Sequence, residues 1–195
     1  MSDSLLGRLL GGLSGRLSGD RNAQAVAGLF TAIVTQARAP AFYRDLGVPD
    51  TLDGRFDLVA LHCFLVMHRL KGRGAAAAAL SKRLYEVMVD DFETSLMEMG
   101  VGDSGIGRRV KTMARGMAGR IRAYDEALAE DPAGGGDRRL EVALDNNVYG
   151  TVEGISPAAL AVLAAYVRTS AAALEAQELE ALLAGDARFP AAPEG

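Results

Sequence analysis

The sequence contains a single cysteine, Cys63, and no tryptophan among its 195 residues. One cysteine excludes an intramolecular disulfide, which fits a reducing compartment. No run approaches the ~18 consecutive apolar residues that a membrane-spanning helix needs, and the first residues lack the pattern of a secretory signal. These absences favour a cytoplasmic protein. β-Branched residues are also too sparse for a chain rich in strands.

Hydrophobic residues make up 49% of the chain and charged residues 24%, with a net charge of −4 at pH 7. This balance is typical of a globular domain, and a chain of this length can bury a sizeable core. The acidic net charge argues against a dedicated DNA- or RNA-binding protein but leaves room for a local basic patch. Abundant alanine favours helix. We therefore expect an all-α protein with one compact domain of about six to eight helices.

Apolar periodicity and helix-terminating residues predict where the helices lie. The expected segments are 22–38, 40–46, 53–71, 75–99, 104–130, 138–147 and a final group between 156 and 183. The 53–71 helix is apolar around most of its circumference, so we expect it at the centre of the fold. The helical domain then covers residues 21–185, and residues 186–195 form a flexible tail.

Residues 1–20 differ in character from the rest of the chain. Several glycines weaken any helix there, each by about 0.8–1 kcal/mol relative to alanine. Placed on a helix, the segment nevertheless has a leucine face that excludes its arginines, and a basic amphipathic helix can lie on an anionic bilayer. The membrane-contact residues of that interpretation are Leu6, Leu10, Leu13 and Leu17. A plain disordered tail is the alternative.

Charge is distributed unevenly around residue 100. Acidic residues close one predicted helix: Glu86, Asp90, Asp91, Glu93 and Glu98. Basic residues open the next: Arg108, Arg109, Lys111, Arg115, Arg120 and Arg122. Both placements oppose the helix dipole and therefore need compensation. Either cross-helix ion pairs form in an antiparallel hairpin, or this surface docks a partner. Gly116 and Gly119 form a small-residue patch, which we expect to mark a helix crossing in the core.

No motif in the chain indicates catalytic or metal chemistry. Gly100 to Gly105 matches G-x-G-x-x-G but follows a helix rather than a strand, so it predicts a helix–helix turn. His62, Cys63 and His68 point in different directions from one helix, and the chain has only 2 histidines. Asp90 and Asp91 point about 100° apart. We expect a protein without enzymatic activity, cofactor or metal.

Several short motifs resemble those of the ubiquinol–cytochrome c chaperone family, over roughly residues 35–170. The most specific is Asp90-Asp91-Phe92 followed by Gly100-Val101-Gly102-Asp103. The weaker ones are Leu46 to Thr51, Gly54-Arg55-Phe56, Leu61-His62, Arg108 to Lys111, Gly119-Arg120 with Tyr124, and Asn147 to Gly150.

This resemblance implies an all-helical assembly factor for respiratory complex III that binds newly made cytochrome b near the membrane. In mitochondrial relatives a small partner protein and the ribosome are also involved. The composition, without a transit peptide, looks bacterial, so we expect a protein peripheral to the inner face of the cytoplasmic membrane. Resemblance and charge pattern together predict a partner-binding surface near Asp90, Asp91, Glu93, Gly102, Asp103, Arg108, Lys111, Arg115, Arg120 and Tyr124.

A second hypothesis assigns the basic helix, residues 104–128, to a ribosome- or RNA-associated tethering module. Binding of that kind depends steeply on salt, because each neutralised phosphate releases counterions. Affinity that stays flat between low and moderate salt would exclude it.

Overall fold

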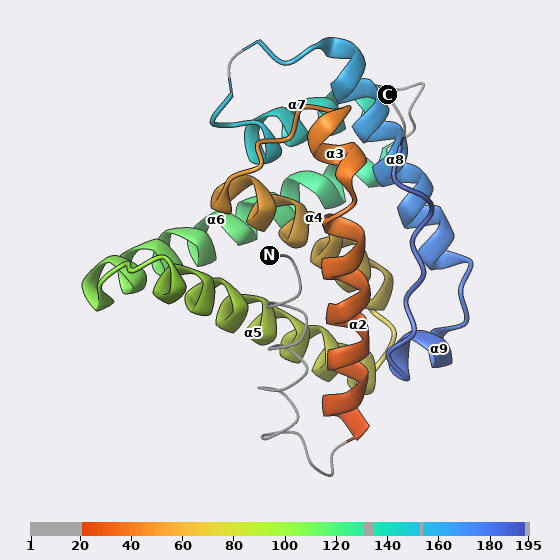
Figure 1. Cartoon of the computed structure of the whole chain (residues 1–195). Helices are drawn as coiled ribbons and strands as arrows, with labels where there is room; N and C mark the ends of the chain where they lie inside the picture. The colour runs from red at the N-terminus through yellow and green to blue at the C-terminus, as the bar shows by residue number, and fades with distance from the viewer. Residues whose placement is uncertain (1–20, 131–134, 153, 194–195) are drawn as a thin grey trace.

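The computed structural model describes residues 21–130, 135–152 and 154–193. These residues form helices and no strands (Figure 1). The helices are α2 (Arg21–Ala37), α3 (Pro40–Arg44), α4 (Leu52–Leu70), α5 (Ala75–Glu98), α6 (Asp103–Ala129), α7 (Gly136–Val148), α8 (Pro157–Glu175) and α9 (Leu179–Leu183). The all-α prediction is confirmed, and the predicted helix limits agree closely. The predicted membrane-contact leucines at 6, 10, 13 and 17 lie outside the described residues.

Helix α4 lies at the centre of the fold, as its uniformly apolar sequence predicts. It packs against α2, α5, α6, α7 and α8. Nearly every side chain from Leu58 to Leu70 is buried. Its first turn is capped by Thr51, whose hydroxyl accepts a hydrogen bond of 3.2 Å from the Gly54 amide. Gly54 has no room for a side chain, because a Cβ there would lie 2.1 Å from the carbonyl oxygen of Pro49.

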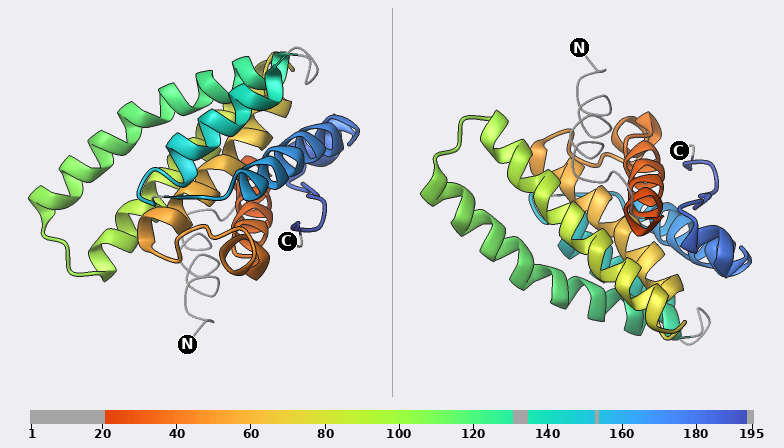
Figure 2. Two further views of the ribbon diagram at one scale, coloured as in Figure 1. Left: turned by 90° about the horizontal axis from the view of Figure 1, so that it is seen from above. Right: turned by 90° about the horizontal axis from the view of Figure 1, so that it is seen from below.

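Helices α5 and α6 form an antiparallel hairpin whose turn extends away from the other helices (Figures 1 and 2). Gly100, with φ of 75°, supplies the left-handed residue that ends α5. The outer part of the hairpin has a hydrophobic cluster of its own, separate from the main core. Its buried members are Phe92, Leu96 and Ile106, with Leu52, Phe56, Val101, Val110 and Met113 packed around them.

One of the two interpretations placed ion pairs between the acidic end of α5 and the basic start of α6, and the described residues show none there. Within the described part of the chain no ion pair joins these two helices; Arg83 pairs with Glu86 on α5 at 2.7 Å, and Arg122 with Glu126 on α6 at 3.1 Å. Apolar contacts hold the hairpin instead. Exposed pairs would in any case contribute only about 0–1 kcal/mol each.

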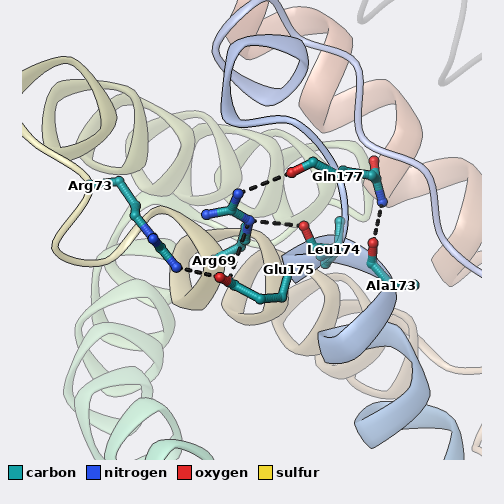
Figure 3. Close-up of polar contacts among 6 residues, drawn as sticks. All are labelled: Arg69, Arg73, Ala173, Leu174, Glu175 and Gln177. Atoms are coloured by element: carbon teal, nitrogen blue, oxygen red, sulfur yellow. Dashed lines mark hydrogen bonds and ion pairs between the residues drawn. The ribbon is translucent and has the colours of Figure 1, made fainter.

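Arg69 fastens the C-terminal ends of α4 and α8 (Figure 3). It is only 7% exposed, and its guanidinium donates to the backbone carbonyls of Leu174 at 2.9 Å and Gln177 at 3.0 Å. Leu174 lies in the last turn of α8 and Gln177 lies just beyond it, so both hydrogen bonds are made at the end of the helix. Arg73 and Arg69 both pair with the exposed Glu175. One buried arginine therefore closes the α8 terminus.

The chain after α9 packs against the domain, in contrast to the flexible tail expected for residues 186–195. Ala187 is buried, and the ring of Phe189 meets the His62 ring edge-on with centroids 5.1 Å apart. The Gln36 side chain donates a 2.9 Å hydrogen bond to the carbonyl of Pro190. The described domain therefore extends to residue 193 rather than 185, because this segment carries apolar side chains that fit the α2–α4 surface.

Two stretches, residues 22–44 and 157–175, are apolar and long enough to cross a membrane by length and composition alone. Neither is an uninterrupted apolar run, since charged residues such as Arg38 and Arg168 interrupt them. Both stretches contribute side chains to the core. The first contains α2 and α3, with Leu29 and Phe30 buried, and the second is α8, with Leu163 and Val167 buried. A buried core helix satisfies the same criterion.

Replacing Arg69 by leucine should lower the free energy of unfolding by about 2–4 kcal/mol, because the carbonyls of Leu174 and Gln177 each lose a charged hydrogen-bond donor. Arg73→Leu is the matched control, since it removes an exposed ion pair to Glu175 and should cost less than about 1 kcal/mol. Urea unfolding followed by circular dichroism measures both. Equal losses would show that Arg69 does not close α8.

Candidate functional site

The hairpin meets the start of α4 at an aromatic pair. The rings of Phe56 on α4 and Phe92 on α5 have centroids 4.4 Å apart. Both rings line two hollows in the surface. The larger one, called the α6 hollow, lies among α4, α6 and the end of α7 and has a volume of about 630 Å³. The smaller one, the α5 hollow, lies between the start of α4 and α5 and has a volume of about 270 Å³.

The α6 hollow has a basic wall and a mixed opposite wall. Helix α6 contributes Arg108, Arg109, Thr112, Met113, Gly116 and Arg120. The remaining lining residues come from α4 and from α7 with its following loop: Asp53, Phe56, Asp57, Asn146, Asn147, Gly150 and Thr151, together with Phe92 of α5. Arg108 and Arg109 are exposed, and neither makes an ion pair with a residue that the structure describes. Their charges are therefore free to attract an anionic group.

The local sequence of α6 explains this orientation. Its apolar positions, spaced by three and four residues, point toward α4 and α5, with Met117 and Tyr124 buried. Gly116 and Gly119 lie on the exposed side, and a Cβ at either would meet nothing within 4 Å. The core helix crossing expected at these glycines is therefore wrong. They leave open surface where another chain can approach the α6 backbone.

An ion pair joins the two walls of the α6 hollow. The Arg120 guanidinium donates to Asp57 at 2.5 Å, and the two side chains are 22% and 14% exposed. The same guanidinium lies over the Phe56 ring, 5.9 Å from its centroid. Burial raises the pKa of Asp57 to about 6, and Asp53 adds to this while Arg120 opposes it. The pair is therefore poorly hydrated and close to an apolar surface.

The α5 hollow contains the carboxylate of Asp91, which makes no ion pair with any residue that the structure describes. Burial raises the pKa of Asp91 to about 6, with Arg38 opposing and Glu98 adding to the shift. No ion pair within the described residues joins Asp91 to Arg38, and the buried Nε of Arg38 has no hydrogen-bond partner. At the rim, Arg55 and Asp50 pair at 2.5 Å. Asp91 and Arg38 thus line the same hollow with opposite charges but do not pair with each other.

The predicted partner-binding residues gather around the hairpin but not on one face. Asp90, Lys111 and Arg115 are exposed along it, Glu93 is half-buried, and Gly102 and Asp103 lie exposed at its turn. Arg108 and Arg120 line the α6 hollow, whereas Asp91 lines the α5 hollow.

Tyr124 does not belong to an accessible surface. It is 2% exposed, and its ring packs on Phe64 with centroids 5.2 Å apart. It continues the apolar stripe of α6 into the core, so its side chain is removed from the partner surface.

Sequence reasoning missed the side chains that α4 and α7 bring to the α6 hollow, above all Asp57 and the amides of Asn146 and Asn147. An acid inside an otherwise apolar helix was the available signal for Asp57. It also missed the exposed methionines near the hairpin turn, Met97 at 57% and Met99 at 60% exposure.

The histidines serve the fold. His62 Nδ1 donates to the Leu58 carbonyl at 2.7 Å, because a carbonyl can only accept. In the neutral ring Nε2 therefore accepts from the Tyr166 hydroxyl at 2.8 Å, and that hydroxyl in turn accepts from Gln36 at 2.9 Å. Burial lowers the pKa of His62 to about 4, so the ring is neutral at pH 7. His68 pairs with Asp125 at 2.7 Å. Among the residues with described positions, no group of three or more histidine, cysteine or acidic side chains is placed to hold a metal ion.

Comparison with known proteins gives a consistent result. A family model described as ubiquinol-cytochrome C chaperone matches residues 44–189. Ubiquinol-cytochrome-c reductase complex assembly factor 1 of Xenopus laevis is 26% identical over 155 residues, which cover 80% of this chain and 74% of that protein. The Mus musculus protein of the same name is 25% identical over 162 residues, covering 83% of this chain and 53% of its own length.

A solved structure is also similar. The crystal structure of the Cbp3 homolog from Brucella abortus superposes with a TM-score of 0.76 at 35% sequence identity. The superposition covers 93% of this chain and 96% of that one. The likeness therefore extends over nearly the whole chain.

Asp91→Asn should make the protein more stable at neutral pH but not in acid. Because the raised pKa favours the protonated carboxyl in the fold, the wild type loses stability as the pH rises from about 4 to about 6. The asparagine variant avoids this loss, so its free energy of unfolding at pH 7.5 should exceed that of the wild type by at most about 3 kcal/mol. Thermal unfolding at pH 4 and pH 7.5 measures the difference.

The neighbouring exposed acid provides the control for this test. Asp90→Asn should change stability little at either pH, since Asp90 is exposed. An Asp91 variant that gains the same stability at pH 4 as at pH 7.5 would contradict the burial argument.

Proposed function

The chain belongs to the ubiquinol-cytochrome c chaperone family, and on that premise we propose that it binds newly made cytochrome b in the α6 hollow during assembly of the ubiquinol–cytochrome c reductase complex. The single observation that carries the location is the hollow itself, about 630 Å³ in volume and lined by the aromatic rings of Phe56 and Phe92. On its α6 wall, Arg108 and Arg109 make no ion pair with a residue that the structure describes. A membrane-protein client offers both apolar segments and charged loops, and the hollow has surfaces for each.

The apolar part of the hollow suits a client with varied apolar segments. Phe56, Phe92 and Met113 line it, and Met97 and Met99 are exposed near the hairpin turn. Methionine is flexible and polarisable, so it adapts to surfaces of irregular shape. Such a surface binds apolar segments without demanding one sequence, as a chaperone requires.

The polar side chains of the hollow can orient a bound client. Arg108 and Arg109 present charged donors at the rim, and the side-chain amides of Asn146 and Asn147 lie on the opposite wall. Groups of this kind hydrogen-bond to the carbonyls and carboxylates of a loop. Gly116 leaves the α6 backbone open between them. The exposed outer residues of the hairpin, among them Asp90, Lys111, Arg115 and Asp103, then form a second contact zone for the same client or for a partner protein.

Reversing Arg108 and Arg109 together to glutamate should lower the recovery of cytochrome b about tenfold while helicity stays unchanged. The free energy involved, about 1.4 kcal/mol, is modest because both side chains are exposed. Recovery is measured by affinity purification of the tagged protein from solubilised native membranes, with mass spectrometry of the bound proteins.

Lys82→Glu with Arg138→Glu is the matched control for this experiment. It changes the net charge equally, but neither residue lines a hollow or has an ion pair among the described residues. Equal loss in both variants would show a general charge effect. Recovery of ribosomal proteins without cytochrome b would contradict the proposed client and favour tethering.

Deleting residues 1–19, which lie outside the described residues, should reduce recovery with membranes and leave thermal stability unchanged. This result is expected if the leucine face of this segment binds lipid and adds nothing to the stability of the core. Flotation with anionic vesicles and thermal unfolding of the same preparations test this together. Unchanged flotation would remove the lipid role from this segment.

A further inference from the structure

We propose that the α6 hollow selects client segments that carry a carboxylate, and that this carboxylate takes Arg120 from Asp57, which binds a proton in exchange. The inference uses the proposed function only for the location of the client. It names the chemistry of the ligand and the residue pair that recognises it.

The geometry leaves Arg120 able to change partners. Its guanidinium is 22% exposed on the wall of the hollow, and one of its N–H groups donates to Asp57. A guanidinium has five N–H donors, and among the described residues Asp57 is the one hydrogen-bond acceptor that this guanidinium meets. The Phe56 ring beneath it fixes its plane, with the guanidinium carbon 5.9 Å from the ring centroid. A carboxylate that enters the hollow therefore meets free donors on an already oriented group.

The charges that face the hollow favour an anionic ligand. Helix α6 supplies Arg108, Arg109 and Arg120, while α4 supplies Asp53 and Asp57. The α5 residue at the hollow is Phe92, and the α7 side contributes the uncharged Asn146, Asn147, Gly150 and Thr151. Tyr124 lies close enough to Asp57 for the two to interact, but it is buried and neutral at pH 7. A lysine or arginine in the client would meet unpaired arginines at the rim.

Two carboxylates beside one arginine do not both stay charged. Like charges at short range raise the pKa of one member of the pair. Asp57 is the member that takes the proton, because burial already raises its pKa to about 6, whereas an exposed glutamate titrates near 4.3. When the ligand occupies Arg120, Asp57 also loses the interaction that opposes this rise. Binding therefore takes up protons from solution, and affinity increases as the pH falls from 8 to 6.

The test uses two synthetic helical peptides of alanine and leucine with blocked ends, one with a single central glutamate and one with glutamine. Each is titrated into the full chain by isothermal calorimetry at pH 7, in two buffers of different ionisation enthalpy. We expect the glutamate peptide to bind about tenfold more tightly, as for one charge-assisted hydrogen bond. We expect proton uptake with that peptide and none with glutamine.

Variants distinguish displacement of Asp57 from Arg120 from a general attraction between the basic wall and a negative charge. Asp57→Asn should bind the glutamate peptide several-fold more tightly than the wild type, because the competing carboxylate is gone, and should lose the proton uptake. Asp53→Asn removes one negative charge from the same rim and should retain the uptake. Arg120→Gln should bind both peptides equally, with helicity by circular dichroism reporting that the fold persists.

Two outcomes overturn the inference. Equal affinity of the wild type for both peptides means that the hollow does not select a carboxylate, and proton uptake that persists in Asp57→Asn means that Asp57 is not displaced. These results differ from failure of the proposed function. If the glutamate peptide binds with proton uptake but cytochrome b is absent from the affinity purification, the proposed client is refuted and the inference stands. If cytochrome b is captured but the two peptides bind equally, the inference is refuted and the proposed function stands.

Discussion

Burial of α4 on every side is the constraint on which the rest of the structure depends. Each of α2, α5, α6, α7 and α8 packs against it. Burial is most complete from Leu58 onward, where the core closes, and Arg69 at its far end ties it to α8. The first two turns are less enclosed. Phe56 and Asp57 therefore lie between core and solvent, where a side chain can both pack and meet a ligand.

The hairpin attaches to α4 at that incompletely buried end. Its own hydrophobic cluster and the contact between Phe56 and Phe92 hold it there, without ion pairs between α5 and α6 among the described residues. Acids at the end of α5 and bases at the start of α6 each oppose the helix dipole, at about 0.3–1 kcal/mol per charge. The fold does not recover this cost through cross-helix pairs among the described residues, and Asp90, Arg108 and Lys111 remain exposed on the surface of the hairpin.

Each hollow beside the aromatic pair holds a half-buried carboxylate with a raised pKa, Asp57 in one and Asp91 in the other. A core built for stability alone would place apolar side chains there. At neutral pH both carboxylates therefore lower stability where the hairpin joins the body. That placement is consistent with a surface shaped for an apolar client that also carries charge, since the hollows combine aromatic, methionine and arginine side chains.

The local sequence determined the helices and their ends. The apolar periodicity of α4 and α6, Thr51 and Ser156 as N-caps and Gly100 as a C-terminal signal act over a few residues, so they can be read in order along the chain. The charge reversal around residue 100 likewise indicated the region of the candidate site.

Only the tertiary structure decided which of those charges share a hollow. Arg120 meets Asp57 across 63 positions, and the contacts from α7 lie further along still. Tyr124 and Arg120 are four residues apart on α6, yet one is buried and the other reaches the hollow, because the rotation of α6 against α4 is set by packing. Residues 186–193 join the domain for the same reason: the surface that Phe189 covers exists only after α2 and α4 have assembled.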